Sequence, residues 1–84
     1  MIGTHRDDTY VRAPNILPAF PHAVRVRPKG GRHRWKDPYG LIYEWDSQHG
    51  AVEVYNARGR PLGEYDPETG ARLKPADPTR EIEP

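Results

Sequence analysis

Glycine-closed turns recur along the second part of the chain and constrain its fold more than any other feature. Four polar clusters each end in a glycine, at Gly40, Gly50, Gly59 and Gly70, with nine to eleven residues between successive glycines. Glycine adopts a positive φ without steric cost, so it commonly completes a tight turn. Short runs rich in aromatic and β-branched residues separate the turns. This spacing predicts an antiparallel β-meander.

The predicted protein is all-β, with a strongly twisted, five-stranded antiparallel sheet. We expect its strands at residues 32–36, 41–46, 51–56 and 62–66 and from residue 72 onward. Side chains alternate between the two faces of a strand, so Glu53 and Tyr55 share one face while Val52 and Val54 lie on the other. The pattern predicts one packed face and one functional face. The strand at 41–46 carries apolar residues on both faces, so the sequence does not say which of its two faces is covered.

Residues 1–31 are predicted to form an irregular arm that packs on the sheet of residues 32–84, within a single small domain. Prolines at positions 14, 18, 21 and 28 interrupt every regular element of the arm. We expect at most one short helical turn at residues 15–17, and residues 23–27 alternate well enough for an edge strand. The apolar side chains expected to cover the sheet are Ile16, Leu17, Phe20 and Val24.

Charge is unevenly distributed, although the whole chain carries a net charge of only +1. Residues 1–36 contain eight Lys/Arg and two acids, whereas residues 37–84 contain five Lys/Arg and ten acids. An acid-free basic run that includes an aromatic side chain favours a nucleic-acid-binding surface. Trp35 would stack on a base while phosphates are held by Arg32, Arg34 and Lys36. The alternative is that these charges only solvate a small protein.

Two acids and a histidine lie close together in the predicted hairpin at residues 43–55. Cleavage of RNA by its own 2′-hydroxyl needs a base, an acid and a cation for the phosphoryl charge. His49 titrates near neutral pH without help, Glu53 is the candidate base, and Asp46 can orient His49. The cation must come from elsewhere in the fold, and the candidates are Arg72, Lys74 and Arg80.

The same three residues allow two other interpretations. Aspartate often caps its own turn and a turn histidine is often exposed, so the group could serve the turn alone. A metal site formed by Asp46, His49 and Glu53 is the second alternative. The chain has no cysteine, which excludes disulfides and thiolate metal sites. We expect neither a metal nor a cofactor.

The run Ile-Tyr-Glu-Trp-Asp-Ser-Gln-His-Gly at residues 42–50 resembles the central motif of the cytotoxic ribonuclease domain of ribosome-cleaving colicins and cloacin. Related domains end contact-dependent growth-inhibition toxins. The likeness extends in order over roughly residues 32–82, through Leu62-Gly63, Asp66-Pro67, Leu73-Lys74 and Asp77-Pro78. The resemblance implies a metal-independent endoribonuclease that cuts 16S ribosomal RNA at the decoding site and stops translation. It also implies the twisted five-stranded sheet.

The resemblance further implies which residues form the active site. The catalytic residues of the family fall on Asp46, His49, Glu53 and Arg80, so Arg80 is singled out among the three candidate cations. Family tyrosines near the site match Tyr43 and Tyr55, and a basic residue matches Lys74. These three join the basic run as candidate RNA-binding residues.

An antibacterial toxin implies a cognate immunity protein, expected to be acidic, and a small ribosomal subunit as target. We expect the toxin to act as a monomer in the target-cell cytoplasm. The sequence has no membrane-spanning run or signal peptide, so another segment of a longer toxin is expected to carry delivery. Two alternatives remain: a non-catalytic RNA- or ribosome-binding module, and a ribonuclease that acts on tRNA or mRNA.

Overall fold

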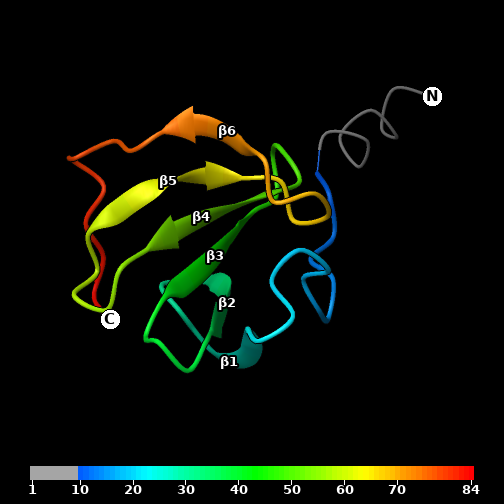
Figure 1. Cartoon of the computed structure of the whole chain (residues 1–84), viewed down its shortest axis with the longest axis horizontal. Coiled ribbons are helices and arrows are strands. Elements are labelled where there is room, and N and C mark those ends of the chain that lie inside the picture. The colour runs from blue at the N-terminus through cyan, green and yellow to red at the C-terminus, as the bar shows by residue number, and fades with distance from the viewer. Residues whose placement is uncertain (1–9) are drawn as a thin grey trace.

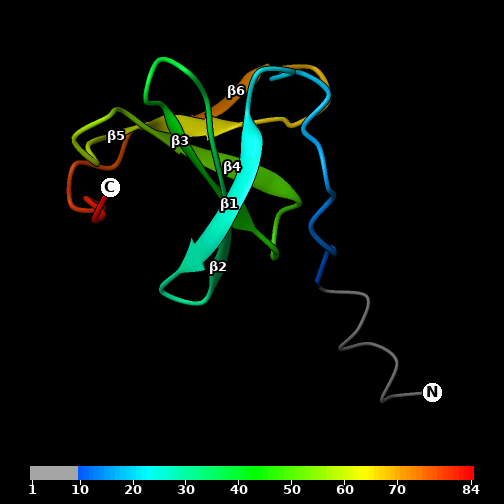
Figure 2. The same ribbon diagram turned by 90° about the horizontal axis from the view of Figure 1, so that it is seen from below.

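The computed structural model describes residues 10–84 and shows six antiparallel strands in one sheet, paired in chain order (Figure 1). The strands are β1 (Val24–Lys29), β2 (Arg32–Lys36), β3 (Ile42–Asp46), β4 (Ala51–Tyr55), β5 (Pro61–Tyr65) and β6 (Arg72–Pro75). In the second view β1 crosses the direction of β4 and β5, which shows how strongly the sheet twists (Figure 2). The all-β antiparallel prediction is confirmed, with one strand more than expected. The additional strand is β1, which overlaps residues 23–27, the part of the arm whose alternation suggests an edge strand.

The four turn glycines have the backbone conformation that the sequence predicts. Their φ angles lie between 63° and 87°. Each glycine donates its N–H to the carbonyl of the Asp or Asn that opens its turn. The side chain of that Asp or Asn accepts the backbone N–H two residues further on. Asp or Asn at the start and glycine at the end therefore set the boundaries of β2 to β6.

One face of the sheet is buried beneath the irregular arm. Trp35, in β2, has no exposed surface, and its ring packs edge-on against Trp45 with centroids 6.3 Å apart. The arm binds both indoles through its backbone: Trp35 Nε1 donates to the Asn15 carbonyl at 3.0 Å and Trp45 Nε1 to the Val11 carbonyl at 2.7 Å. Leu17 packs into the same hydrophobic core. This is the packed face that the alternation predicts.

Two details of the arm differ from expectation. Residues 15 and 16 form a bend in place of the expected helical turn, and no described residue is helical. The Asn15 carbonyl accepts from Trp35 instead. Phe20 packs on the core with Leu17, but Ile16 is 71% exposed and Val24 is 63% exposed. Val24 lies on the edge strand, where only one neighbour can cover it. Within residues 10–84 there is no helix that could span a membrane.

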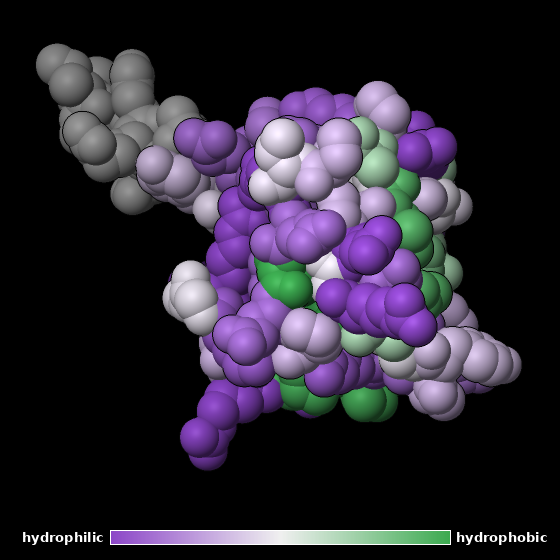
Figure 3. All heavy atoms as spheres, turned by 90° about the vertical axis from the view of Figure 1, so that its left-hand side faces the viewer, coloured by the Kyte–Doolittle hydropathy of each residue, from purple (hydrophilic) through white to green (hydrophobic). Residues whose placement is uncertain are grey.

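The other face of the sheet carries a row of charged side chains. Successive cross-strand partners in β2 to β6 are Arg34, Glu44, Glu53, Glu64 and Lys74. Directly paired residues of antiparallel strands point to the same face, so these five side chains lie together. Figure 3 views the molecule from the side that carries the C-terminal segment, where most of the surface is hydrophilic. The predicted functional face is therefore polar.

Candidate active site

A cavity of about 260 Å³ opens on the charged face of the sheet. It is bordered by the turn after β3, by β4, β5 and β6, and by the segment that follows β6. The four residues predicted to be catalytic, Asp46, His49, Glu53 and Arg80, all line it. Arg80 is 27 residues from Glu53 in the chain, so only the folded sheet brings the set together.

Asp46 ends β3 and binds the imidazole of His49. Its Oδ2 lies 2.7 Å from Nδ1 of His49, and its Oδ1 accepts the N–H of Gln48 at 3.0 Å. Burial on its own would raise the pKa of Asp46, but the hydrogen bond and charge of His49 and the Gln48 N–H lower it overall. Asp46 is therefore an ionised acceptor that fixes the ring through Nδ1. Nε2 has no hydrogen-bond partner within residues 10–84 and remains free for a substrate.

Glu53, in the centre of β4, receives three hydrogen bonds on one oxygen. Its Oε1 accepts from Arg32 Nη1 at 2.8 Å, Tyr55 Oη at 2.9 Å and Arg80 Nη2 at 2.9 Å. Burial and the hydrogen bond to Glu53 raise the pKa of Tyr55, so the phenol stays protonated and donates. No described donor contacts Oε2. One carboxylate oxygen is thus held in place while the other can accept a proton.

Arg80 is positioned by contacts of the segment that follows β6. Its N–H donates to the Asp77 carbonyl at 3.0 Å, and Thr79 Oγ1 donates to the Asp77 carboxylate at 2.7 Å. Two residues further on, the Ile82 N–H donates to the Gly59 carbonyl at 2.9 Å. A side chain at Gly59 would collide with the Ile82 carbonyl. The turn between β4 and β5 therefore holds the segment that places Arg80 at the cavity.

The structure separates the three candidate cations. Arg80 and Lys74 line the cavity. Arg72 does not, and its guanidinium donates to the Leu62 carbonyl at 3.0 Å. Of the other predicted RNA-binding residues, Arg32 and Tyr55 also line the cavity, where both contact Glu53.

Four predicted RNA-binding side chains do not reach the cavity. Trp35 lies in the core beneath the arm, so it is not available to stack on a base. Tyr43 packs on the same covered face, and its hydroxyl donates to Asp37 at 2.9 Å. Arg34 is on the charged face, but it is buried in an ion pair with Glu44. Lys36 is partly exposed away from the cavity, and its contact with RNA stays a prediction.

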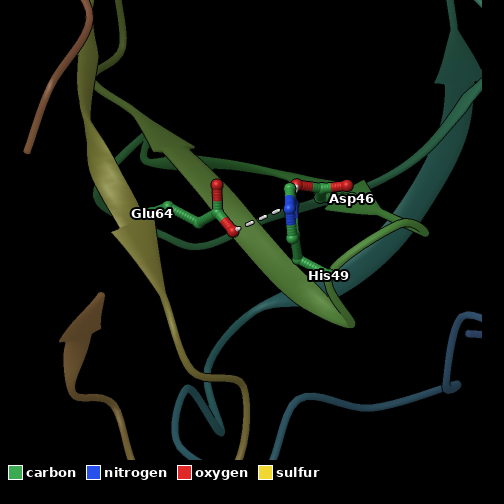
Figure 4. A group of neighbouring side chains, drawn as sticks. All are labelled: Asp46, His49 and Glu64. Carbon is green, nitrogen blue, oxygen red and sulfur yellow. Dashed lines mark hydrogen bonds and ion pairs between the residues drawn. The ribbon is translucent and has the colours of Figure 1, made fainter. Parts of the chain in front are cut away.

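Sequence reasoning missed Glu64, a buried carboxylate in β5. Its Oε2 lies 3.8 Å from Nδ1 of His49, opposite Asp46 (Figure 4). Burial, followed by the nearby charge of Asp46, raises the pKa of Glu64. Counting outward from the Tyr55–Pro61 pair would place Gly63 opposite Glu53, but a register shift between Val54 and Tyr55 places Glu64 there instead. The sequence carries no signal for that shift, so the position of Glu64 could not be predicted from it.

Among the described residues, Asp46, His49 and Glu64 offer possible ligand atoms that all lie within 4.8 Å of one another. The metal site considered from the sequence had Glu53 as its third ligand, but Oε1 of Glu53 is bound by two guanidinium groups. We assign no ion to the group, because Asp46 and His49 already bond to each other and an acidic cluster alone does not define a metal site.

Comparison with known proteins identifies the family of this chain. Residues 11–83 match the family model described as "Cytotoxic". Colicin E3 of Escherichia coli is 46% identical over 70 residues, which cover 81% of this chain and 13% of that protein. Cloacin, also of Escherichia coli, is 53% identical over 55 residues, which cover 63% of this chain and 10% of that protein. The chain thus spans only a small part of these relatives. The chain belongs to the Cytotoxic family.

Proposed function

We propose that this domain is a toxin ribonuclease that cleaves 16S ribosomal RNA at the decoding site of the small ribosomal subunit and stops translation. The observation that carries the proposal is the meeting of Asp46, His49, Glu53 and Arg80 at one cavity. This set provides a base, an acid and a cation within reach of one phosphodiester. The similarity to colicin E3 and cloacin supports the same substrate.

In the proposed reaction, Glu53 removes the proton of a 2′-hydroxyl through its free oxygen, Oε2. The 2′-oxygen attacks phosphorus, and the bond from phosphorus to the 5′-oxygen breaks. His49 donates the Nε2 proton to that leaving oxygen, while Asp46 fixes the ring through Nδ1. The products are a 2′,3′-cyclic phosphate and a 5′-hydroxyl, and no step requires a metal ion.

Arg80 stabilises the charge that gathers on the phosphoryl oxygens. In the free protein Arg80 and Arg32 both bind Oε1 of Glu53, at 2.9 and 2.8 Å. Their side chains are 46% and 37% exposed, so both can also reach an incoming phosphate. Lys74, which also lines the cavity, provides a further phosphate contact. Charge-assisted hydrogen bonds of this type are stronger than those between neutral groups.

The relatives support a biological setting for this proposal. The domain is delivered from a producing bacterium as part of a larger toxin and acts as a monomer in the cytoplasm of the target cell. Its producer makes a cognate immunity protein, expected to be acidic, which binds the exposed cations of the domain. Charge complementarity of this kind mainly accelerates association.

The test is primer extension across the 3′ region of 16S ribosomal RNA after treatment of intact bacterial ribosomes. The purified domain is compared with His49→Ala and Glu53→Ala, and with Glu68→Gln as an exposed control. We expect one new stop at the decoding site with the parent and with the control, and none with the two site variants. Chelation with EDTA, at constant ribosome integrity, should leave the parent active.

Two results would count against the proposal. Intact ribosomal RNA despite folded protein, together with ribosome binding that persists in His49→Ala, would indicate a binding module. Cleavage of tRNA or mRNA at a higher rate than of ribosomes would retain the enzyme and change its substrate.

A further inference from the structure

Glu64 is a buried acid that the proposed reaction does not use. Its side chain is 8% exposed, yet no described residue donates a hydrogen bond to its carboxylate. No fully buried side-chain oxygen of the described residues lacks a partner, so the Glu64 oxygens retain a small contact with the solvent in the cavity in place of a donor. Glu64 therefore does not stabilise the fold in the way that the paired Glu44 does.

The carboxylate of Glu64 points at the imidazole of His49. Its Oε2 is 3.8 Å from Nδ1, and Oδ2 of Asp46 is 2.7 Å from the same nitrogen (Figure 4). A neutral ring needs only one acceptor at Nδ1. Two carboxylates beside a single ring nitrogen instead favour the positively charged imidazolium.

Other charged groups line the same cavity as His49. Lys74 of β6 is the cross-strand partner of Glu64 and favours its ionised form. Glu53 of β4 adds a further negative charge on the same face, although its Oε1 is bound by guanidinium groups. The carboxylates on the sheet beside His49 thus come from β3, β4 and β5, whereas the cations of the cavity, Arg32, Lys74 and Arg80, come from β2, β6 and the segment after β6.

The position of Glu64 also has a cost for the fold. Cross-strand pairing places it directly opposite Glu53, and like charges in directly opposed positions destabilise a sheet. Burial and the charge of Asp46 raise the pKa of Glu64, which shows that ionisation is unfavourable there. Groups held against their ionisation preference concentrate at functional sites.

We propose that Glu64 is a positioning residue that, together with Asp46, keeps His49 as the imidazolium and so ready to protonate the leaving 5′-oxygen. The inference rests on the proposed ribonuclease function, because it assigns His49 the role of the acid.

The test is the isosteric variant Glu64→Gln, with the exposed Glu68→Gln as the matched control. Single-turnover cleavage of ribosomes is measured between about pH 5 and 9. Removing one charge about 4 Å from a half-exposed ring should move the alkaline limb of the profile to lower pH by roughly half to one unit. The rate on the acidic plateau should change little, and Glu68→Gln should reproduce the parent profile.

Proton NMR of the free domain tests the inference without activity. The pH at which the His49 ring signals change by half should be lower in Glu64→Gln than in the parent, and unchanged in Glu68→Gln. A shift in the NMR titration without cleavage by the parent would refute the ribonuclease function and retain the electrostatic role of Glu64. Identical titrations for the parent and Glu64→Gln would overturn the inference, even if cleavage were slower.

Discussion

Replacing Arg34 by methionine should unfold much of the protein, not weaken its contact with RNA. Arg34 donates from Nη2 at 2.6 Å and from Nε at 3.2 Å to Oε2 of Glu44. The two side chains are only 4% and 6% exposed. Arg34→Met keeps the length of the aliphatic chain but leaves the Glu44 carboxylate buried without its cation. Breaking a buried pair in this way costs about 3–5 kcal/mol.

That loss is large for a chain of 84 residues. Domains have a stability of about 0.05–0.15 kcal/mol per residue, so the total here is on the order of 4–13 kcal/mol. With a denaturant slope of about 1–3 kcal/mol per M, the urea midpoint should fall by at least about 1 M. The double variant Arg34→Met with Glu44→Leu removes both charges and should recover most of the loss.

Urea unfolding followed by tryptophan fluorescence measures the effect, since Trp35 lies next to Arg34 and is fully buried. Lys36→Met is the matched control, because Lys36 is on the same strand and face but only partly buried. The control should change stability by less than about 0.5 kcal/mol. An unchanged midpoint for Arg34→Met, with ribosome affinity reduced about tenfold, would refute the reasoning and restore Arg34 as an RNA contact.

Three shorter predictions concern the site itself. His49→Gln should reduce cleavage by roughly 10²–10⁴-fold while the melting temperature stays within a few degrees; a smaller loss would assign the acid to another group. Glu64→Gln should stabilise the protein at neutral pH. Burial and the charge of Asp46 raise the pKa of Glu64 in the folded protein above its value in the unfolded chain. Ionisation of Glu64 therefore lowers the stability of the parent as the pH rises from the unfolded pKa to the folded pKa. The difference between the melting curves of variant and parent should vanish below the unfolded pKa, about pH 4, and a difference that persisted there would have another cause. Gly59→Ala should lower both melting temperature and cleavage more than Gly31→Ala, since both glycines have φ near 80° but only a side chain at position 59 would meet the Ile82 carbonyl. Equal effects would mean that backbone strain alone matters.

The strands could be predicted from the sequence because the turns that separate them are local. Gly50, for example, needs only the Asp46 carbonyl four residues earlier to close its turn. The prediction placed β2 at the observed residues, and β3, β4 and β5 within one residue of theirs. Alternation then placed Glu53 and Tyr55 on one face, as the structure has them.

What the sequence did not provide depends on contacts between distant segments. Trp35 was expected at the RNA surface because it lies in a basic run, but the run alternates between two faces. The face of Trp35 is covered by Asn15 and its neighbours. Their sequence has no periodicity from which this contact with Trp35 could be predicted. The approach of Glu64 to His49 likewise needs the register of β4 against β5, in addition to the turn at the tip.

The charged face also explains how a chain with a net charge of only +1 could act on RNA. Three of its cations are already paired: Arg32 and Arg80 with Glu53, and Arg34 with Glu44. An incoming phosphate therefore exchanges with a carboxylate at the two arginines, instead of meeting unpaired positive charge. Such an exchange contributes little to non-specific affinity, which depends on the number of phosphates neutralised. In the proposed function, it favours a phosphate that the ribosome presents directly at the cavity, where the carboxylate released from the arginines is the proposed base.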